Sequence, residues 1–256
     1  MQQTRTVGIA RGRPQVDNSA LSRSGMESNT SVRTLLILIT ISLLAACADP
    51  VEEAKEAVKA RATHPRGIQY RELQVLRNDV VCGEFMEDDR WGEGPGFQPF
   101  FVRNGEAHLR PSELDLKIFC GTDPASALQS ELGIGPVNRE NASLVKVYSD
   151  LSTLTAALEA YRTDFGEYPS QVTRKGLQAL TRPRRGSPDP EDTYIVDVPL
   201  DPWGQEYTYH TPRILHGAKD KYELFTLGRD GKIGGAGEDA DIGSQHLAYL
   251  DHVGDL

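Results

Sequence analysis

Apolar side chains, positive charge and cysteine are all in short supply in this sequence. Hydrophobic residues make up 38% of the 256 positions, whereas 24 glycines and 15 prolines indicate many turns, so we expect small cores and long loops. The net charge of −9 and the pI near 5.2 argue against a nucleic-acid partner, because no basic face is available to neutralise phosphates. An acidic surface suits an exported protein that binds cations.

The residue sets of common enzyme sites are also missing. The sequence has no Ser/His/Asp set, no zinc set and no phosphate-binding loop. Four acids, which we call the acidic loop, are the candidate source of catalytic carboxylates: Glu84, Glu87, Asp88 and Asp89. Acid–base catalysis needs two carboxyl groups at a set separation in a cleft, whereas clustered acids beside glycines are more often a solvated surface. We therefore predict that the protein is not an enzyme. A hydrolase that uses the acidic loop ranks third, behind two non-enzymatic hypotheses.

The apolar run near the N-terminus is too short to span a membrane comfortably. The apolar run at residues 34–46 (TLLILITISLLAA) has 13 residues, whereas a transmembrane helix needs about 20. It has the length of a signal-peptide core and follows Arg33, with Met26 at a sensible start. We therefore assign residues 1–46 to a leader.

The leader ends in LAAC, which resembles a bacterial lipobox. That resemblance implies that Cys47 is lipidated and becomes the N-terminus after cleavage. The alternative is an ordinary secretory signal in which Cys47 is incidental. By resemblance to enterobacterial sorting, Ala48 favours the outer membrane, so we expect a lipid-anchored, periplasm-facing envelope protein.

Only two cysteines remain, Cys82 and Cys120. In an exported protein two such cysteines most simply pair, and their spacing does not fit a CxxC metal or redox motif. We predict a structural disulfide between them.

The chain after the leader divides into a polar stalk at 47–64, a small β-rich domain at 65–135, an α+β domain at 136–245 and a tail at 246–256. The stalk contains a predicted helix over Pro50–Arg61. In the β-rich domain, alternating apolar and polar side chains predict strands at 69–76, 79–85 and 96–102, separated in part by a glycine-rich loop at 86–95.

The α+β domain begins with the clearest helix in the chain. Six apolar residues at spacings of 3, 4, 3, 4 and 3 form one stripe: Leu144, Val147, Leu151, Leu154, Leu158 and Tyr161. A short helix follows at 175–180. The DPWG turn at 201–204 leads into a strand at 205–210, which we expect to pair as a hairpin with a strand at 221–227.

Four segments of this domain resemble the globular part of the major pseudopilin of bacterial type II secretion. They are DLSTLTAALEAYRTDFGEYPS, KGLQAL, DPWGQEYTY and YELFTLGRDGKIGGAGEDADIG, and they occur in that family's order over about 100 residues. The resemblance implies a long N-terminal helix packed on a small antiparallel sheet.

The last segment contains a glycine-rich loop, residues 227–242. Its glycines permit tight turns that aim carbonyls inward, and Ca2+ prefers six to eight oxygen ligands on such a flexible loop. The spacing does not fit an EF-hand, and GGAGED matches the start of a calcium-binding β-roll repeat only once. The pseudopilin resemblance implies that the side chains of Asp230, Asp239 and Asp241 bind Ca2+, helped by backbone oxygens near Leu227 and Ile233. The alternative is a solvated acidic turn.

The chain departs from the family at its N-terminal side. A pseudopilin begins with a glutamate-bearing apolar helix of about 20 residues that builds the filament core. Here residues 34–46 contain no acid, and an extra domain follows Cys47. We predict a non-enzymatic, lipid-anchored envelope protein that serves type II secretion as an accessory and touches pseudopilus components or cargo. The alternative is an anchored binding or adhesion module unrelated to secretion.

Overall fold

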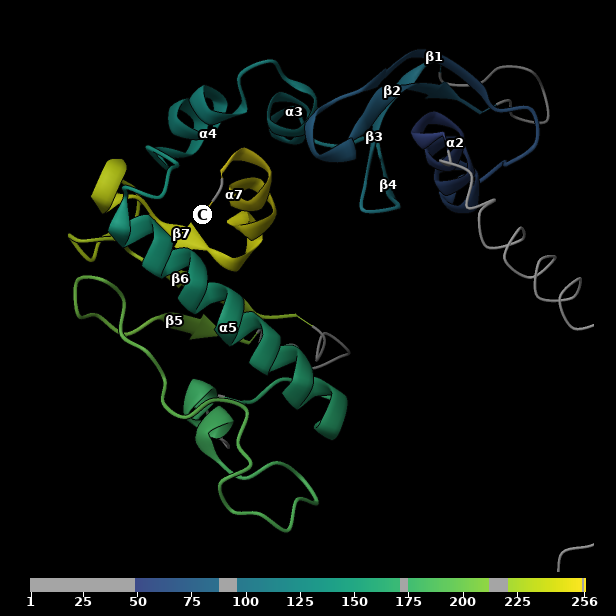
Figure 1. Ribbon diagram of the computed structural model, residues 1–256. Coiled ribbons are helices and arrows are strands. Elements are labelled where there is room, and N and C mark those ends of the chain that lie inside the picture. Colours follow the sequence, from purple (N-terminus) through teal and green to yellow (C-terminus); the bar gives the residue numbers. More distant parts are fainter. Residues whose placement is uncertain (1–48, 88–95, 171–174, 212–220, 255) are drawn as a thin grey trace, which may run out of the picture. The chain divides into compact units, whose positions relative to one another are not determined.

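The computed structural model describes residues 49–87, 96–170, 175–211, 221–254 and 256 (Figure 1). The leader and Cys47 lie outside the described residues. Within the described ranges no helix is both long enough and apolar enough to span a bilayer.

An antiparallel sheet of four strands in chain order forms the first folded region. Its elements are α2 (Pro50–Arg61), β1 (Gln69–Val75), the short helix η1 (Arg77–Asp79), β2 (Val81–Met86), β3 (Gln98–Arg103) and β4 (Glu106–Leu109). The three predicted strands are present. The fourth, β4, was not predicted; it pairs with β3 through a tight turn in which Asn104 and Gly105 both have positive φ.

The two faces of this sheet contribute to two different hydrophobic clusters. One face carries Phe85, Phe100 and Val102 and packs against α2, which contributes Ala54 and Val58 (Figure 1). The stretch predicted as a polar stalk is thus a helix that covers the sheet. Side chains on the opposite face, including Cys82 and Phe101, belong to the main core of the rest of the molecule.

Strand β1 departs from the regular alternation predicted for residues 69–76. Its register with β2 shifts between Arg71 and Gln74, and Glu72 in this interval has φ of 55°. The irregularity changes which side chains face inward. Val75 is consequently 47% exposed.

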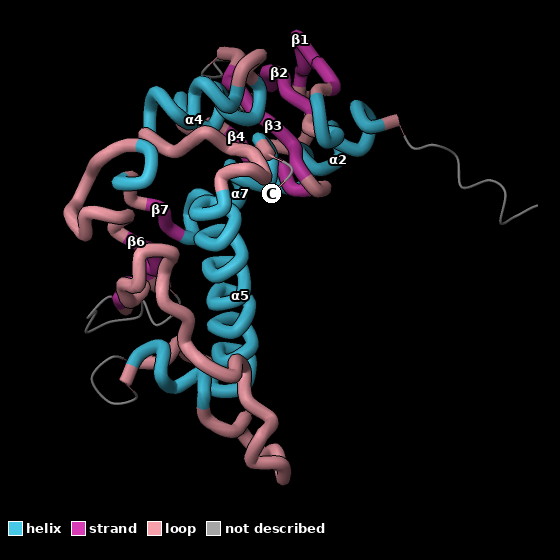
Figure 2. Tube along the Cα trace, turned by 60° about the vertical axis from the view of Figure 1, so that its left-hand side comes forward, coloured by secondary structure: helices cyan, strands magenta, loops and turns pink. Residues whose placement is uncertain are grey.

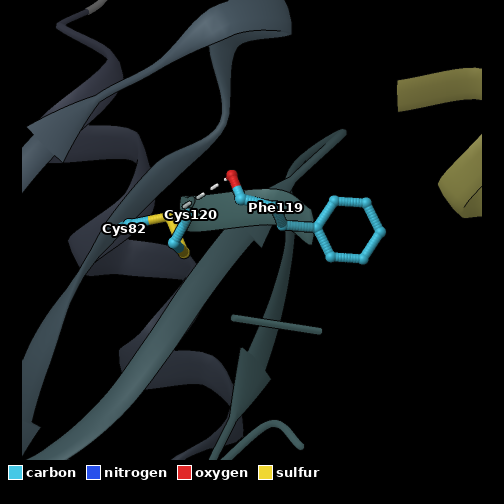
Figure 3. Close-up of a disulfide and its surroundings, with 3 residues drawn as sticks. All are labelled: Cys82, Phe119 and Cys120. Carbon is cyan, nitrogen blue, oxygen red and sulfur yellow. Dashed lines mark hydrogen bonds between the residues drawn. A yellow bond between two sulfur atoms is a disulfide. The ribbon is translucent and has the colours of Figure 1, made fainter. Parts of the chain in front are cut away.

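Helical segments connect the sheet to the long helix. They are α3 (Glu113–Asp115), the π-helical turn η2 (Leu116–Cys120) and α4 (Pro124–Leu132). The predicted disulfide is present and joins Cys82 in β2 to Cys120 in η2, with Cα atoms 5.9 Å apart (Figure 3). The neighbouring Phe119 ring points away from the disulfide and stacks on Phe101 at 4.6 Å between centroids.

The long helix α5 (Ala142–Phe165) is the longest described helix (Figure 2). It carries the apolar stripe predicted from the sequence, and all six stripe residues are buried. It begins where the Asn141 side chain accepts a hydrogen bond from the Leu144 N–H, and it ends at Gly166 in the left-handed conformation.

A second antiparallel sheet, in the order β5-β6-β7, packs against α5 (Figure 1). The remaining elements are the short helix η3 (Gly176–Thr181), β5 (Thr208–His210), β6 (Glu223–Thr226), η4 (Gly237–Asp239), β7 (Ile242–Gly243), η5 (Ser244–His246) and α7 (Leu247–Val253). The predicted hairpin of β5 and β6 is present. This arrangement confirms the predicted α+β fold with a long helix on a small antiparallel sheet.

The main core extends beyond the α+β region. It combines stripe residues of α5 with Phe101 of β3, Ile118 of η2, and Leu250 and Val253 of α7. The stretch predicted as a tail therefore contributes a helix to the core. Val80 and Cys82 complete the link to the first sheet.

Candidate metal site

The glycine-rich loop connects β6 to β7. These strands pair antiparallel, with Thr226 opposite Ile242, so the sheet fixes both ends of the loop. Between them most of the loop is exposed, whereas Gly228 and Ala240 near its ends are buried. A mostly polar segment of this length needs further contacts to hold one conformation.

The DPWG turn supplies the first of these contacts. Asp201 is only 3% exposed, and its Oδ1 accepts hydrogen bonds from the backbone N–H groups of Trp203 and Gln205 at 3.0 and 2.8 Å. Its Oδ2 accepts the Thr226 hydroxyl at 2.6 Å, and that hydroxyl oxygen accepts the Gly228 N–H at 3.2 Å. The buried carboxylate thus joins the turn to the start of the loop.

Gln205 fixes the next two residues of the loop. Its Nε2 donates to the carbonyl oxygens of Gly228 and Arg229 at 2.8 and 3.2 Å. The Arg229 N–H in turn donates to the Glu238 carbonyl at 2.7 Å, which joins the two sides of the loop.

Two glycines allow the two sides of the loop to approach each other. Gly228 has φ of +66°, and a Cβ there would lie 2.7 Å from the Glu238 carbonyl oxygen. Gly235 has φ of +106°, and its Cβ would lie 2.2 Å from the Asp239 carbonyl oxygen. A side chain at either position would both strain the backbone and push the loop open.

The three predicted acidic ligands are in different environments. Asp230 is exposed, and its Oδ1 accepts the Lys232 N–H at 3.0 Å. Asp239 forms an ion pair with Arg229, with Nε 3.1 Å from Oδ1. Asp241 accepts the Gly234 N–H at 2.8 Å through Oδ2.

Asp241 also has a buried carboxylate oxygen, Oδ1, without a hydrogen-bond partner among the described residues. A buried carboxylate oxygen without a partner is costly, and a cation beside it would remove that cost. The residue set therefore fits a hard cation at this atom. Two residues were predicted to supply backbone oxygens as ligands. Leu227 is half-buried, and Ile233 is 91% exposed.

The loop is not a cluster of preassembled side-chain ligands. Across the residues that the structure describes, no three His, Cys, Asp or Glu side chains form a group able to hold a metal ion. Calcium differs from zinc in accepting backbone carbonyl oxygens and water as ligands, so it does not require such a cluster. One of the three acids, Asp239, already has a positively charged partner in Arg229. The hydrogen bond to the Asp239 carboxylate raises the pKa of the Arg229 guanidinium.

The acidic loop does not assemble a catalytic pair from its two described members. The Glu84 carboxylate pairs with Arg71, whereas buried Glu87 accepts the His64 N–H at 2.9 Å through Oε2 and has Arg110 3.8 Å from Oε1. Glu84 and Glu87 are three residues apart on an extended chain, so their side chains point to opposite sides of it. Asp88 and Asp89 lie outside the described residues.

Sequence reasoning treated the DPWG segment only as a turn and missed the roles of Asp201 and Gln205 in holding the loop. The signal available was an acid at the first turn position, which commonly caps backbone N–H groups. The contact of Asp201 with Thr226 joins residues far apart in the sequence, and no local pattern indicates it.

Comparison with known proteins places the α+β region in a family. The family model described as type II secretion system (T2SS), protein G, matches residues 137–245. The type II secretion system core protein G of Pseudomonas aeruginosa is 39% identical over 109 residues, which make up 41% of this chain and 72% of that relative. The core protein G of Vibrio cholerae is 41% identical over 115 residues, or 43% of this chain and 73% of the relative.

The protein of the same name from Pectobacterium carotovorum is 38% identical over 114 residues. The matched residues contain α5, the second sheet and the glycine-rich loop. The resemblance seen in the sequence is therefore confirmed, and this chain belongs to the type II secretion system protein G family.

Proposed function

We propose that this chain is a non-enzymatic envelope component of type II protein secretion, in which a Ca2+ ion stabilises the pseudopilin-like region. The family membership supports the secretion role. The observation that carries the calcium proposal is the buried Asp241 Oδ1, which has no hydrogen-bond partner among the described residues.

In this proposal the carboxylates of Asp230, Asp239 and Asp241 and backbone oxygens near Leu227 and Ile233 hold the ion. The bound ion supplies positive charge that removes repulsion between acids held close together. The chain's own contacts from Asp201 and Gln205 fix the start of the loop, so that the ion has to order only the remainder. An ion that binds only the folded chain stabilises it by mass action.

The test uses residues 48–256 produced without a lipid. Thermal unfolding is recorded in EDTA and in about 1 mM Ca2+, a concentration at which extracellular calcium modules work. We expect an upward shift of Tm that disappears in the Asp239→Ala, Asp241→Ala double variant. The exposed Asp197→Ala variant is the control and keeps the shift. A folded protein without any shift would remove the calcium proposal.

The accessory role is supported by the start of α5. The family resemblance implies that an apolar helix leads into the long helix of a filament subunit. In this chain the Asn141 side chain caps α5, and the segment before it turns, with the Asn141 N–H donating to the Asn138 carbonyl. A folded region with its own four-stranded sheet, and not an apolar helix continuous with α5, precedes α5 among the described residues. We propose that the chain contacts the pseudopilus or its cargo and does not build the shaft.

Crosslinking in a bacterium that secretes through this system tests the role. We expect adducts with other secretion-system components, and loss of secreted protein in the medium when the gene is deleted. Unchanged secretion without such adducts would favour an anchored binding or adhesion module.

The anchor proposal concerns Cys47, which is lipidated in this reading and attaches the chain to the periplasmic side of the outer membrane. Labelling cells with a radioactive fatty acid tests it. The wild-type protein should be labelled and the Cys47→Ala variant should not. Label on both proteins, or on neither, would contradict the assignment.

A further inference from the structure

We propose that the helix α4, which precedes the family-matching region, braces the glycine-rich loop through Gly133. Gly133 is then a positioning residue for the loop, and it lies outside residues 137–245. The part of this inference that concerns ion affinity rests on the calcium proposal, whereas the brace itself does not.

The contact is a backbone hydrogen bond. The Gly237 N–H donates to the Gly133 carbonyl at 2.8 Å. Gly237 begins η4, which contains Asp239, so the bond reaches the part of the loop that carries a proposed ligand.

The brace is anchored at its own side by α4. The Asp123 side chain caps this helix by accepting the Ser126 N–H at 3.1 Å, and Leu128 is fully buried in the main core. Gly133 ends the helix in the left-handed conformation, and its N–H donates to the Gln129 carbonyl at 3.0 Å. The acceptor offered to the loop is therefore held by a packed helix.

Close approach at this point requires glycine. A Cβ on Gly133 would lie 2.7 Å from the Gly235 carbonyl oxygen and 3.0 Å from the Ala236 Cα. Both are atoms of the loop backbone, so a larger residue would displace the loop itself and not a flexible side chain. Gly133 also has φ of +68°, which disfavours other residues.

The brace lies beside the proposed ion site. The end of α4 and the loop together line a hollow of about 510 Å³, and its lining includes Gln129, Gly133, Gly235, Asp241 and His246. Asp241 is also the residue whose buried Oδ1 has no hydrogen-bond partner among the described residues. A loop already held near this atom has less ordering entropy to lose when an ion binds, so the brace raises ion affinity.

The first experiment needs no substitution. Amide hydrogen exchange of residues 48–256 in EDTA measures whether the Gly237 N–H, in an exposed part of the loop, is protected without any ion. Protection is expected from the bond to Gly133. Exchange of Gly237 at the rate of an unstructured peptide would overturn the brace.

The second experiment compares Gly133→Ala with Gly166→Ala. Gly166 caps α5 in nearly the same conformation, with φ of 75° and ψ of 4°, but apart from its chain neighbours no atom of the described residues lies within 4 Å of where its Cβ would be. Both variants carry the same backbone strain, and only Gly133→Ala pushes on the loop. We expect faster exchange of residues 234–241 in Gly133→Ala alone.

Calcium titration of the same proteins tests the affinity. Loss of one hydrogen bond predicts that Gly133→Ala binds Ca2+ about fivefold more weakly, whereas Gly166→Ala binds as the wild type does. Equal affinity of all three proteins would overturn the coupling. If the wild type binds no Ca2+ at all, the calcium proposal fails while the exchange data still decide the brace.

Discussion

Asp241 and Asp239 are neighbours in the loop, yet their carboxylates are balanced in different ways. Asp239 is paired with a cation of the protein, Arg229, whereas Asp241 has a buried oxygen for which the described residues offer no donor. An added ion would gain most at Asp241 and would compete with Arg229 at Asp239. The ion would therefore give Asp241 a partner that the described residues do not supply, whereas at Asp239 it would have to displace Arg229.

The competition gives a prediction for Arg229→Gln. The guanidinium lies 3.1 Å from Asp239 and 2.7 Å from Glu238, and its removal leaves the proposed ligand Asp239 free for Ca2+. Because the pair is exposed, we expect only about two- to threefold tighter binding, measured by calorimetric titration. The Arg185→Gln variant, whose arginine contacts the Asp164 carbonyl, is the control. Weaker binding by Arg229→Gln would show that Arg229 orients Asp239 for the ion.

His252 makes stability depend on pH. It is 1% exposed, and burial, followed by the positive charges of Arg77 and Arg103, lowers its pKa. Between this lowered pKa and the unfolded value of about 6.5, the unfolded chain binds a proton that the folded chain does not. The stabilisation is therefore complete above about pH 6.5 and is lost as the pH falls towards the folded pKa.

We expect His252→Gln to lose part of this acid sensitivity. Urea unfolding at pH 7 and pH 5 should show a decrease in unfolding free energy that is smaller in the variant by about 1 kcal/mol. An unchanged difference between the two pH values in His252→Gln would contradict the assignment.

At the scale of elements, periodic segments were predictable and their connections were less so. The α5 stripe and the hairpin of β5 and β6 could be predicted because each depends on the spacing of apolar residues within a single helix or strand. Strand β4 was missed although Asn104-Gly105 is a strong hairpin signal, because its four residues are too few for a clear alternation.

The candidate loop was found from its acids and glycines, but its supports were not. Asp201 and Gly133 act on the loop from sequence positions far away, and the Gly133 contact joins the end of a helix to a loop about a hundred residues later. Only the folded backbone brings such pairs together. Sequence spacing therefore indicates candidate ligands more readily than the residues that hold the loop in place.

The disulfide is the covalent link between two elements, β2 and η2. Replacing both cysteines, Cys82→Ala and Cys120→Ala, frees the unfolded chain from a closed loop, and we expect unfolding free energy to fall by about 3 kcal/mol. Urea unfolding with and without dithiothreitol measures the same difference in the wild type, and reductant should not affect the double variant. Equal midpoints of the wild type under both conditions would contradict this role.

At the scale of the whole molecule, the region before residue 137 shares one core with α5 and with α7, and α7 lies just beyond the family-matching residues. The Phe119 ring lies 5.6 Å from that of Tyr249 and 5.1 Å from that of His252, and Arg103 forms an ion pair with Asp251. The added region is thus part of one packing arrangement with α7.

A fragment of residues 137–256 should therefore be less stable than residues 48–256, since removal of Phe101, Ile118 and Phe119 exposes core positions. We expect a lower Tm and binding of a dye that reports exposed apolar surface. The comparison is made in Ca2+ for both proteins, so that the ion contributes to each. An equal Tm would show that the family-matching region folds independently.

The link between Cys82 and Cys120 also divides the molecule mechanically. Tension applied at residue 49 and at the C-terminal end acts both on the chain before Cys82, which contains α2 and β1, and on the chain after Cys120. The sulfur bridge transmits the tension between these two parts, so the backbone of residues 83–119 carries no load. In a single-molecule pulling experiment, these residues should lengthen the chain only after reduction. Under oxidising conditions the covalent loop would thus protect most of the first sheet from a pull on the chain ends.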